Sequence, residues 1–110
     1  MGWNNGRSIK DILPELVLPK SQERPLTNET RKFMRDMVAT QPSRANAELA
    51  DRRDLPYSLS ETFLVENGDR FFGSPSLKWQ WPRDSYQLVP KIAAIMSQQY
   101  HYLLDQQRRK

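Results

Sequence analysis

The clearest hydrophobic pattern lies near the C-terminal end of the chain. From Pro90 to about residue 109, apolar residues recur three or four positions apart, which is the spacing of one helix face. Proline also suits the first position of a helix. The pattern therefore predicts a helix over 90–109, with an apolar stripe of Ile92, Ile95, Met96, Tyr100, Leu103 and Leu104 and a polar face of Lys91, Gln98, Gln99, Gln106 and Gln107.

A second amphipathic pattern covers residues 29–40. It places Phe33, Met34, Met37 and Val38 on one stripe, with Thr27 or Asn28 as the N-cap. This helix must end before Pro42, because proline cannot continue it.

A shorter helix is predicted over 43–53. Ser43 is a good N-cap, and Pro56 closes the segment, but the apolar face around Leu49 is narrow. We expect this helix to pair with the one at 29–40.

The segment from Ser58 to Phe72 allows two interpretations. Asn67-Gly68 between apolar runs is typical of a β-hairpin. The spacing of Ser58 and Glu61 instead fits a capping box. Because Phe63, Leu64 and Val65 do not alternate with polar residues, the sequence favours a short helix over 60–66 that Gly68 terminates.

Frequent prolines divide the rest of the chain. The stretch from Pro14 to Pro25 is apolar but interrupted, so we expect residues 1–26 to form an extended strap outside a single helical domain at 27–110. Only 37% of the residues are hydrophobic, against roughly 45–50% in an ordinary globular chain. The expected fold is thus mostly α, with short capped helices at about 29–40, 43–53, 60–66 and 90–109, joined by proline-broken extended segments around a core that is small or completed by a partner.

Four aromatic residues stand close together in a segment rich in glycine and proline. Phe71, Phe72, Trp79 and Trp81 lie within 71–82, where we expect irregular backbone. Their rings could belong to the chain's own core, fill pockets on a partner as interface anchors do, or stack on bases of a single-stranded nucleic acid. The sequence leaves these alternatives open.

Few residues offer catalytic or ligand-binding chemistry. The chain has no cysteine and one histidine, His101, with no second histidine to share a metal. Its four glycines form neither a phosphate-binding loop nor a dinucleotide fingerprint. We therefore expect no enzyme activity, cofactor, metal or small-molecule substrate.

Charge suggests the partner class. Seventeen basic and thirteen acidic residues give a net charge of +4, and most cations have an acidic residue nearby. The sequence shows neither a signal peptide nor a membrane span. We therefore expect a cytoplasmic, non-catalytic subunit that joins acidic protein subunits of a large intracellular assembly, such as a ciliary or microtubule-based lattice. Its expected contacts are the aromatic residues above and the arginine pairs Arg52, Arg53, Arg108 and Arg109.

Two other functions fit the same features. The first is a small helical nucleic-acid-binding or ribosome-associated protein that uses the basic end of the last helix, Arg108-Arg109-Lys110. The second is a phage- or plasmid-type regulator of one host protein.

Overall fold

The computed structural model describes residues 8–43 and 56–108, with backbone only from 104 onward. Within these ranges the chain forms the helices α1 (Ile9–Leu16), α2 (Lys20–Thr40), α4 (Tyr57–Phe72) and α5 (Ser85–Arg108), and no strand. The predicted mostly helical fold is thus confirmed. The radius of gyration of 13.6 Å is close to the roughly 13 Å of a compact domain of this size.

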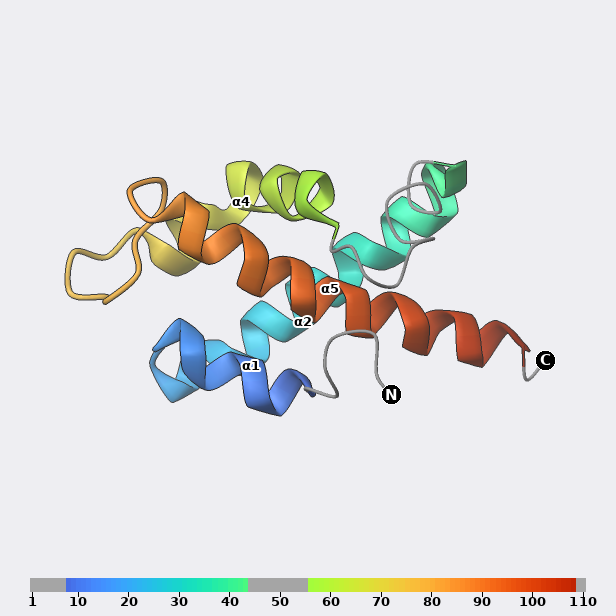
Figure 1. Cartoon of the computed structure of the whole chain (residues 1–110), viewed down its shortest axis with the longest axis horizontal. Coiled ribbons are helices and arrows are strands. Elements are labelled where there is room, and N and C mark those ends of the chain that lie inside the picture. Colours follow the sequence, from blue (N-terminus) through green and yellow to red (C-terminus); the bar gives the residue numbers. More distant parts are fainter. Residues whose placement is uncertain (1–7, 44–55, 109–110) are drawn as a thin grey trace.

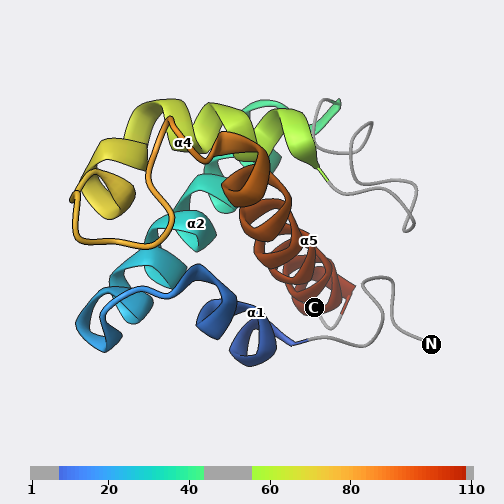
Figure 2. The same ribbon diagram turned by 60° about the vertical axis from the view of Figure 1, so that its left-hand side comes forward.

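Helix α5 lies at the centre of the arrangement. It runs between α4 on one side and α1 on the other, with α2 crossing behind it (Figure 1). The turned view shows α4 above α5, α1 below it and α2 to its left, and all three pack against it (Figure 2). The run from Ile92 to Ser97 is buried at every position, so this part of α5 is enclosed on all sides and has no polar face.

The core draws on all four described helices. Leu16, Met34, Phe63 and Ile95 are each at most 1% exposed and contribute from α1, α2, α4 and α5 respectively. Phe63 also contacts Phe33 edge to face, with ring centroids 5.7 Å apart, a favourable aromatic arrangement. These side chains are enclosed by the chain itself.

Three prolines lie inside helices, although the sequence predicts that prolines interrupt them. Pro14, Pro25 and Pro90 lie inside α1, α2 and α5, each at the sixth residue of its helix. A proline within a helix costs about 3 kcal/mol, whereas burial of one large apolar side chain yields roughly 1.5–3 kcal/mol. Fully or almost fully buried residues flank each proline: Ile12, Leu16, Leu26, Leu88 and Ile92. Packing therefore outweighs the local penalty.

The prediction of an extended strap at 1–26 is wrong for the residues that the structure describes. Residues 9–16 and 20–26 are helical, and Ile12, Leu16 and Leu26 belong to the same core as the rest of the chain. The break between α1 and α2 is short. It includes Val17, whose φ of 53° is a left-handed conformation rare for a β-branched residue.

Other helix boundaries also differ from the prediction. α2 begins at Lys20, so Thr27 is an interior residue whose hydroxyl donates to the Glu23 carbonyl instead of capping the helix. The predicted 60–66 helix is real but longer, and the hairpin alternative is wrong. The predicted helix at 43–53 lies almost entirely outside the described residues.

Gly68 does not terminate α4; it lies inside the helix beneath an indole ring. A Cβ at this position would collide with the ring of Trp81. The backbone N–H of Trp81 in turn donates to the Phe72 carbonyl at 2.9 Å, which holds the 73–84 connection against the end of α4. Gly68 is therefore required for the close approach of this connection.

Asp84 closes the connection just before α5. Its carboxylate accepts hydrogen bonds from Arg83 Nε at 3.0 Å and from the Gln80 N–H at 2.9 Å. The bond from Arg83, followed by that from Gln80, lowers the pKa of Asp84 below its ordinary value. The carbonyl of Asp84 accepts the N–H of Leu88 at 3.0 Å, so the turn leads directly into α5.

Gly68→Ala tests the approach of Trp81 to α4. Alanine in an ordinary helix interior would stabilise the chain by roughly 0.5–1 kcal/mol relative to glycine. Here the new methyl group meets the indole, and we expect destabilisation of about 1–3 kcal/mol. Urea unfolding followed by circular dichroism measures the difference. In the Trp81→Ala background the same substitution should become neutral or stabilising, and a stabilising Gly68→Ala in the otherwise native chain would contradict the contact.

Asp84→Asn tests the turn before α5. Because the pKa of Asp84 is lowered on folding, its carboxylate stabilises the fold above the unfolded pKa of roughly 3.9. This contribution is lost as the pH falls through the folded pKa. The variant should be less stable than the native chain at pH 6, and the difference should shrink as the pH falls below about 4.

Urea midpoints across this pH range measure the effect of Asp84→Asn. Asp69→Asn, at an exposed position of α4, serves as the matched control and should change stability little. A difference between native chain and Asp84→Asn that stays constant down to pH 2 would contradict the assignment.

Candidate functional site

The structure places the two phenylalanines proposed as partner anchors inside the core. Phe71 is 3% exposed and Phe72 is fully buried, both in the last turn of α4. Phe71 also stacks on Phe63, with centroids 6.5 Å apart. These rings are not available to a partner, and of the alternatives left open by the sequence the own-core interpretation holds for them.

The two tryptophans are half-buried and held by contacts within the chain. Trp79 Nε1 donates to the carbonyl of Glu15 on α1 at 2.9 Å, although 64 positions separate the two residues. Lys78 and Lys91 approach its ring, with their Nζ atoms 5.2 and 5.5 Å from the ring centroid. Both Trp79 and Trp81 pack against the core. Their main role in this structure is to fasten the 73–84 connection.

Most of the arginines predicted to contact a partner lie outside the described residues. Arg52, Arg53 and Arg109 are outside the described residues, and Arg108 is described only as the last backbone position of α5. The structure therefore brings none of the eight predicted partner-binding residues into a described site.

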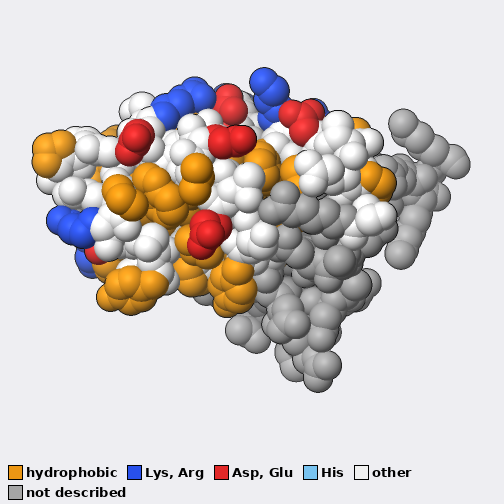
Figure 3. Space-filling view, turned by 90° about the horizontal axis from the view of Figure 1, so that it is seen from above, with side chains coloured by type: hydrophobic (Ala, Val, Ile, Leu, Met, Phe, Trp, Pro, Cys, Tyr) orange, Lys and Arg blue, Asp and Glu red, His pale blue; other side chains and the backbone are white. Residues whose placement is uncertain are grey.

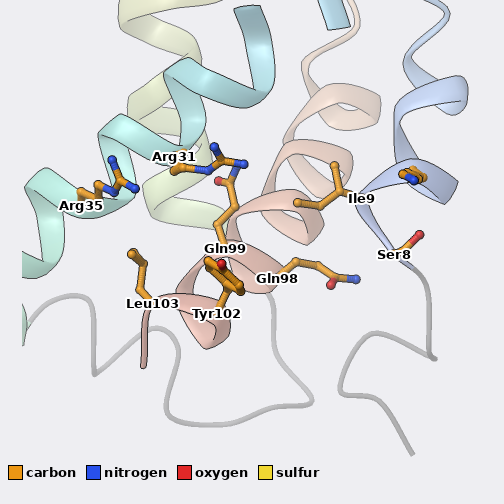
Figure 4. A pocket seen from close by; sticks show the side chains of 9 residues that line it. Ser8, Ile9, Arg31, Arg35, Gln98, Gln99, Tyr102 and Leu103 are labelled. Carbon is orange, nitrogen blue, oxygen red and sulfur yellow. The ribbon is translucent and has the colours of Figure 1, made fainter. Parts of the chain in front are cut away.

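Among the described residues, a pocket of about 480 Å³ lies between α1, α2 and α5. Figure 4 shows side chains from all three helices around it. We call it the cationic pocket, because its basic residues come from two helices. Its described lining consists of Ser8, Ile9, Lys10, Arg31, Arg35, Gln98, Gln99, Tyr102 and Leu103.

Helix geometry brings the basic residues together. Arg31 and Arg35 are four positions apart on α2 and therefore share a face, and both extend towards the pocket in Figure 4. Lys10 lies in the first turn of α1, where the positive end of the helix dipole adds to the field. No carboxylate among the described residues forms an ion pair with these three side chains. Among the described residues, these three cations therefore have no ion-pair partner, although the Asp11 carboxylate lies in the same turn as Lys10 and accepts from the Ser8 N–H at 3.0 Å.

Gln99 forms the floor of the cationic pocket. It is only 3% exposed, and it extends from α5 towards α2 (Figure 4). Its Nε2 donates to the Thr27 carbonyl at 3.1 Å and to Thr30 Oγ1 at 2.9 Å. Its Oε1 is buried and has no hydrogen-bond partner. An unsatisfied buried acceptor costs roughly 1–3 kcal/mol, so this atom favours any donor that enters the pocket.

The sequence contained part of the signal for this pocket. The i, i+4 spacing of Arg31 and Arg35 is visible in the sequence, but it does not show which other helices these side chains face. Lys10 fell in the segment predicted as an extended strap. Gln99 was assigned to a polar face, whereas it is buried. The consecutive apolar residues within 92–97 were the sign in the sequence that this part of α5 is enclosed.

The other described surface features offer fewer groups that could bind a ligand. Tyr57 and Tyr86 line a shallower hollow of about 340 Å³ between α4 and α5 and are 51% and 75% exposed. On the face over α4, apolar side chains are interspersed with basic and acidic ones (Figure 3). This hollow shows no buried polar group without a partner.

The described residues contain no group of three or more histidine, cysteine or acidic side chains placed to hold a metal ion. None of their helices combines the length and apolar character needed to cross a bilayer.

Comparison with known proteins gives one match. Residues 10–110 match the model of a family described as a domain of unknown function, DUF8843. The chain belongs to the DUF8843 family. The match includes α1 from Lys10 onward and the pocket residues from Lys10 to Leu103, whereas Ser8 and Ile9 precede it. No curated protein and no solved structure shows a significant match to the chain.

Proposed function

We propose that the chain is a non-catalytic interaction subunit that binds an acidic protein partner through the cationic pocket. The observation that carries this proposal is the convergence of Lys10, Arg31 and Arg35 on one concave surface without acidic partners among the described residues. Complementary charge across an interface steers association and selects the partner. Arginine is also preferred at protein interfaces because its planar donors fit carboxylates.

The lining of the pocket supports binding over catalysis. Its described residues provide cations, amides and hydroxyl groups, and they include no histidine or carboxylate to serve as a general base. The half-buried tryptophans support the proposal indirectly. Because the tryptophans pack within the chain's own fold, we propose that the partner contacts the cationic pocket and not these rings.

The setting of this interaction is part of the proposal. A subunit of a large intracellular assembly remains the function that we propose, and a ciliary or microtubule-based lattice is the setting that acidic partner surfaces favour. A nucleic-acid partner would use the same cations. The described lining holds one aromatic residue, Tyr102, which is 61% exposed. Because single-stranded nucleic acids stack on several successive rings, we propose the protein partner.

A peptide-binding measurement tests the role of the cationic pocket. Fluorescence anisotropy would compare a labelled glutamate octapeptide with a labelled dT16 oligonucleotide on the full chain. Arg31→Gln with Arg35→Gln removes two carboxylate contacts and should weaken binding of the glutamate peptide at least about tenfold. The native affinity should fall as salt is added, because the partners are exposed charges.

Lys32→Gln is the control for each substitution of the double variant. It removes one positive charge from a neighbouring position of α2, as each arginine substitution does, but Lys32 lines a different hollow beside Glu29, Asp36 and Glu66. Its effect should stay below about twofold. Equal weakening by Lys32→Gln, or tighter binding of the oligonucleotide than of the peptide by the native chain, would contradict the proposal.

A further inference from the structure

We propose that the cationic pocket recognises a peptide carboxylate together with a neighbouring backbone N–H of the same segment. The inference rests on the proposed function, because it specifies which chemical groups of the acidic partner enter the pocket. It is carried by the juxtaposition of a fixed, buried acceptor, Gln99 Oε1, with the cations Arg31, Arg35 and Lys10.

The orientation of the Gln99 amide follows from its partners. A backbone carbonyl only accepts hydrogen bonds, so the atom that contacts the Thr27 carbonyl at 3.1 Å must be the NH₂ group. The Thr30 hydroxyl agrees with this arrangement, since it donates to the Thr27 carbonyl at 3.0 Å and is free to accept from Gln99. A flipped amide would set two acceptors against each other. Oε1 is therefore the atom left for a ligand.

The ligand must supply two kinds of group. Guanidinium and ammonium groups only donate, so the rim of Arg31, Arg35 and Lys10 requires an acceptor of negative charge. Gln99 Oε1 only accepts, so it requires a donor. An acidic peptide carries both within one residue, as a side-chain carboxylate and a backbone N–H. The phosphodiester backbone of a nucleic acid offers acceptors alone.

The dimensions of the pocket fit a short segment. Its volume of about 480 Å³ lies within the roughly 300–1,000 Å³ of ordinary ligand pockets. Arg31 and Arg35 are exposed at its rim, whereas Gln99 is buried at its floor. A bound peptide can thus keep its carboxylates near the rim and present one N–H to the floor. Figure 4 shows Gln99 extending from α5 towards the part of α2 that carries Arg31.

The test compares two peptides of equal charge on the full-length chain. The first is acetyl-Glu-Glu-Glu-amide, and the second is the same peptide with its backbone nitrogens methylated and its terminal amide dimethylated, which removes every N–H donor and keeps the carboxylates. NMR titration would follow the side-chain amide signals of Gln99 and yield the affinities. We expect the Gln99 signals to shift with the first peptide and the methylated peptide to bind about tenfold more weakly, as expected for the loss of one hydrogen bond at a buried acceptor.

The outcomes separate this inference from the proposed function. If both peptides bind equally and Arg31→Gln with Arg35→Gln weakens both, the acidic partner stands but recognition by Gln99 is overturned. If the first peptide binds without moving the Gln99 signals, the inference is also overturned. If acetyl-Gln-Gln-Gln-amide binds as well as the acidic peptide, or the double variant changes nothing, both the inference and the proposed function fail.

Discussion

The enclosure of α5 is the packing constraint on which the remaining structure depends. The described helices α1, α2 and α4 each pack against α5, and Ile92, Ile95 and Met96 are fully buried among them. A helix that is apolar on all sides must be covered on all sides. That requirement draws α1 into the fold and keeps α1, α2 and α5 helical through Pro14, Pro25 and Pro90.

The same enclosure gives Gln99 its significance. A glutamine in the buried length of α5 must find partners for its amide, and α2 supplies them through Thr27 and Thr30. These bonds join α5 to α2 and bring Gln99, Arg31 and Arg35 to one pocket. The fold and the cationic pocket are therefore not separate features, because the polar contact between α5 and α2 also leaves the buried amide oxygen without a partner.

The sequence predicted which segments are helical better than it predicted where each helix begins and ends. Apolar periodicity identified the stripes of Met34 and Ile95, because helical spacing is a local property. It failed at Pro14 and Pro25, where tertiary packing overrides a local penalty, and at Gly68, whose role depends on the distant Trp81. The aromatic residues were recognised as unusual, but only burial could assign Phe71 and Phe72 to the core. The pocket could not be predicted, since Lys10, Arg31 and Gln99 meet only through the packing of separate helices.

Hydrogen exchange on the purified, partner-free chain tests the central claim most directly. If α5 is enclosed by the chain's own helices, the amides of residues 92–99 exchange only through global unfolding, and their protection matches the free energy of unfolding from urea titration. Exchange of these amides at nearly the rate of an unstructured peptide would show that α5 lacks this cover, and the account of both core and pocket would be contradicted.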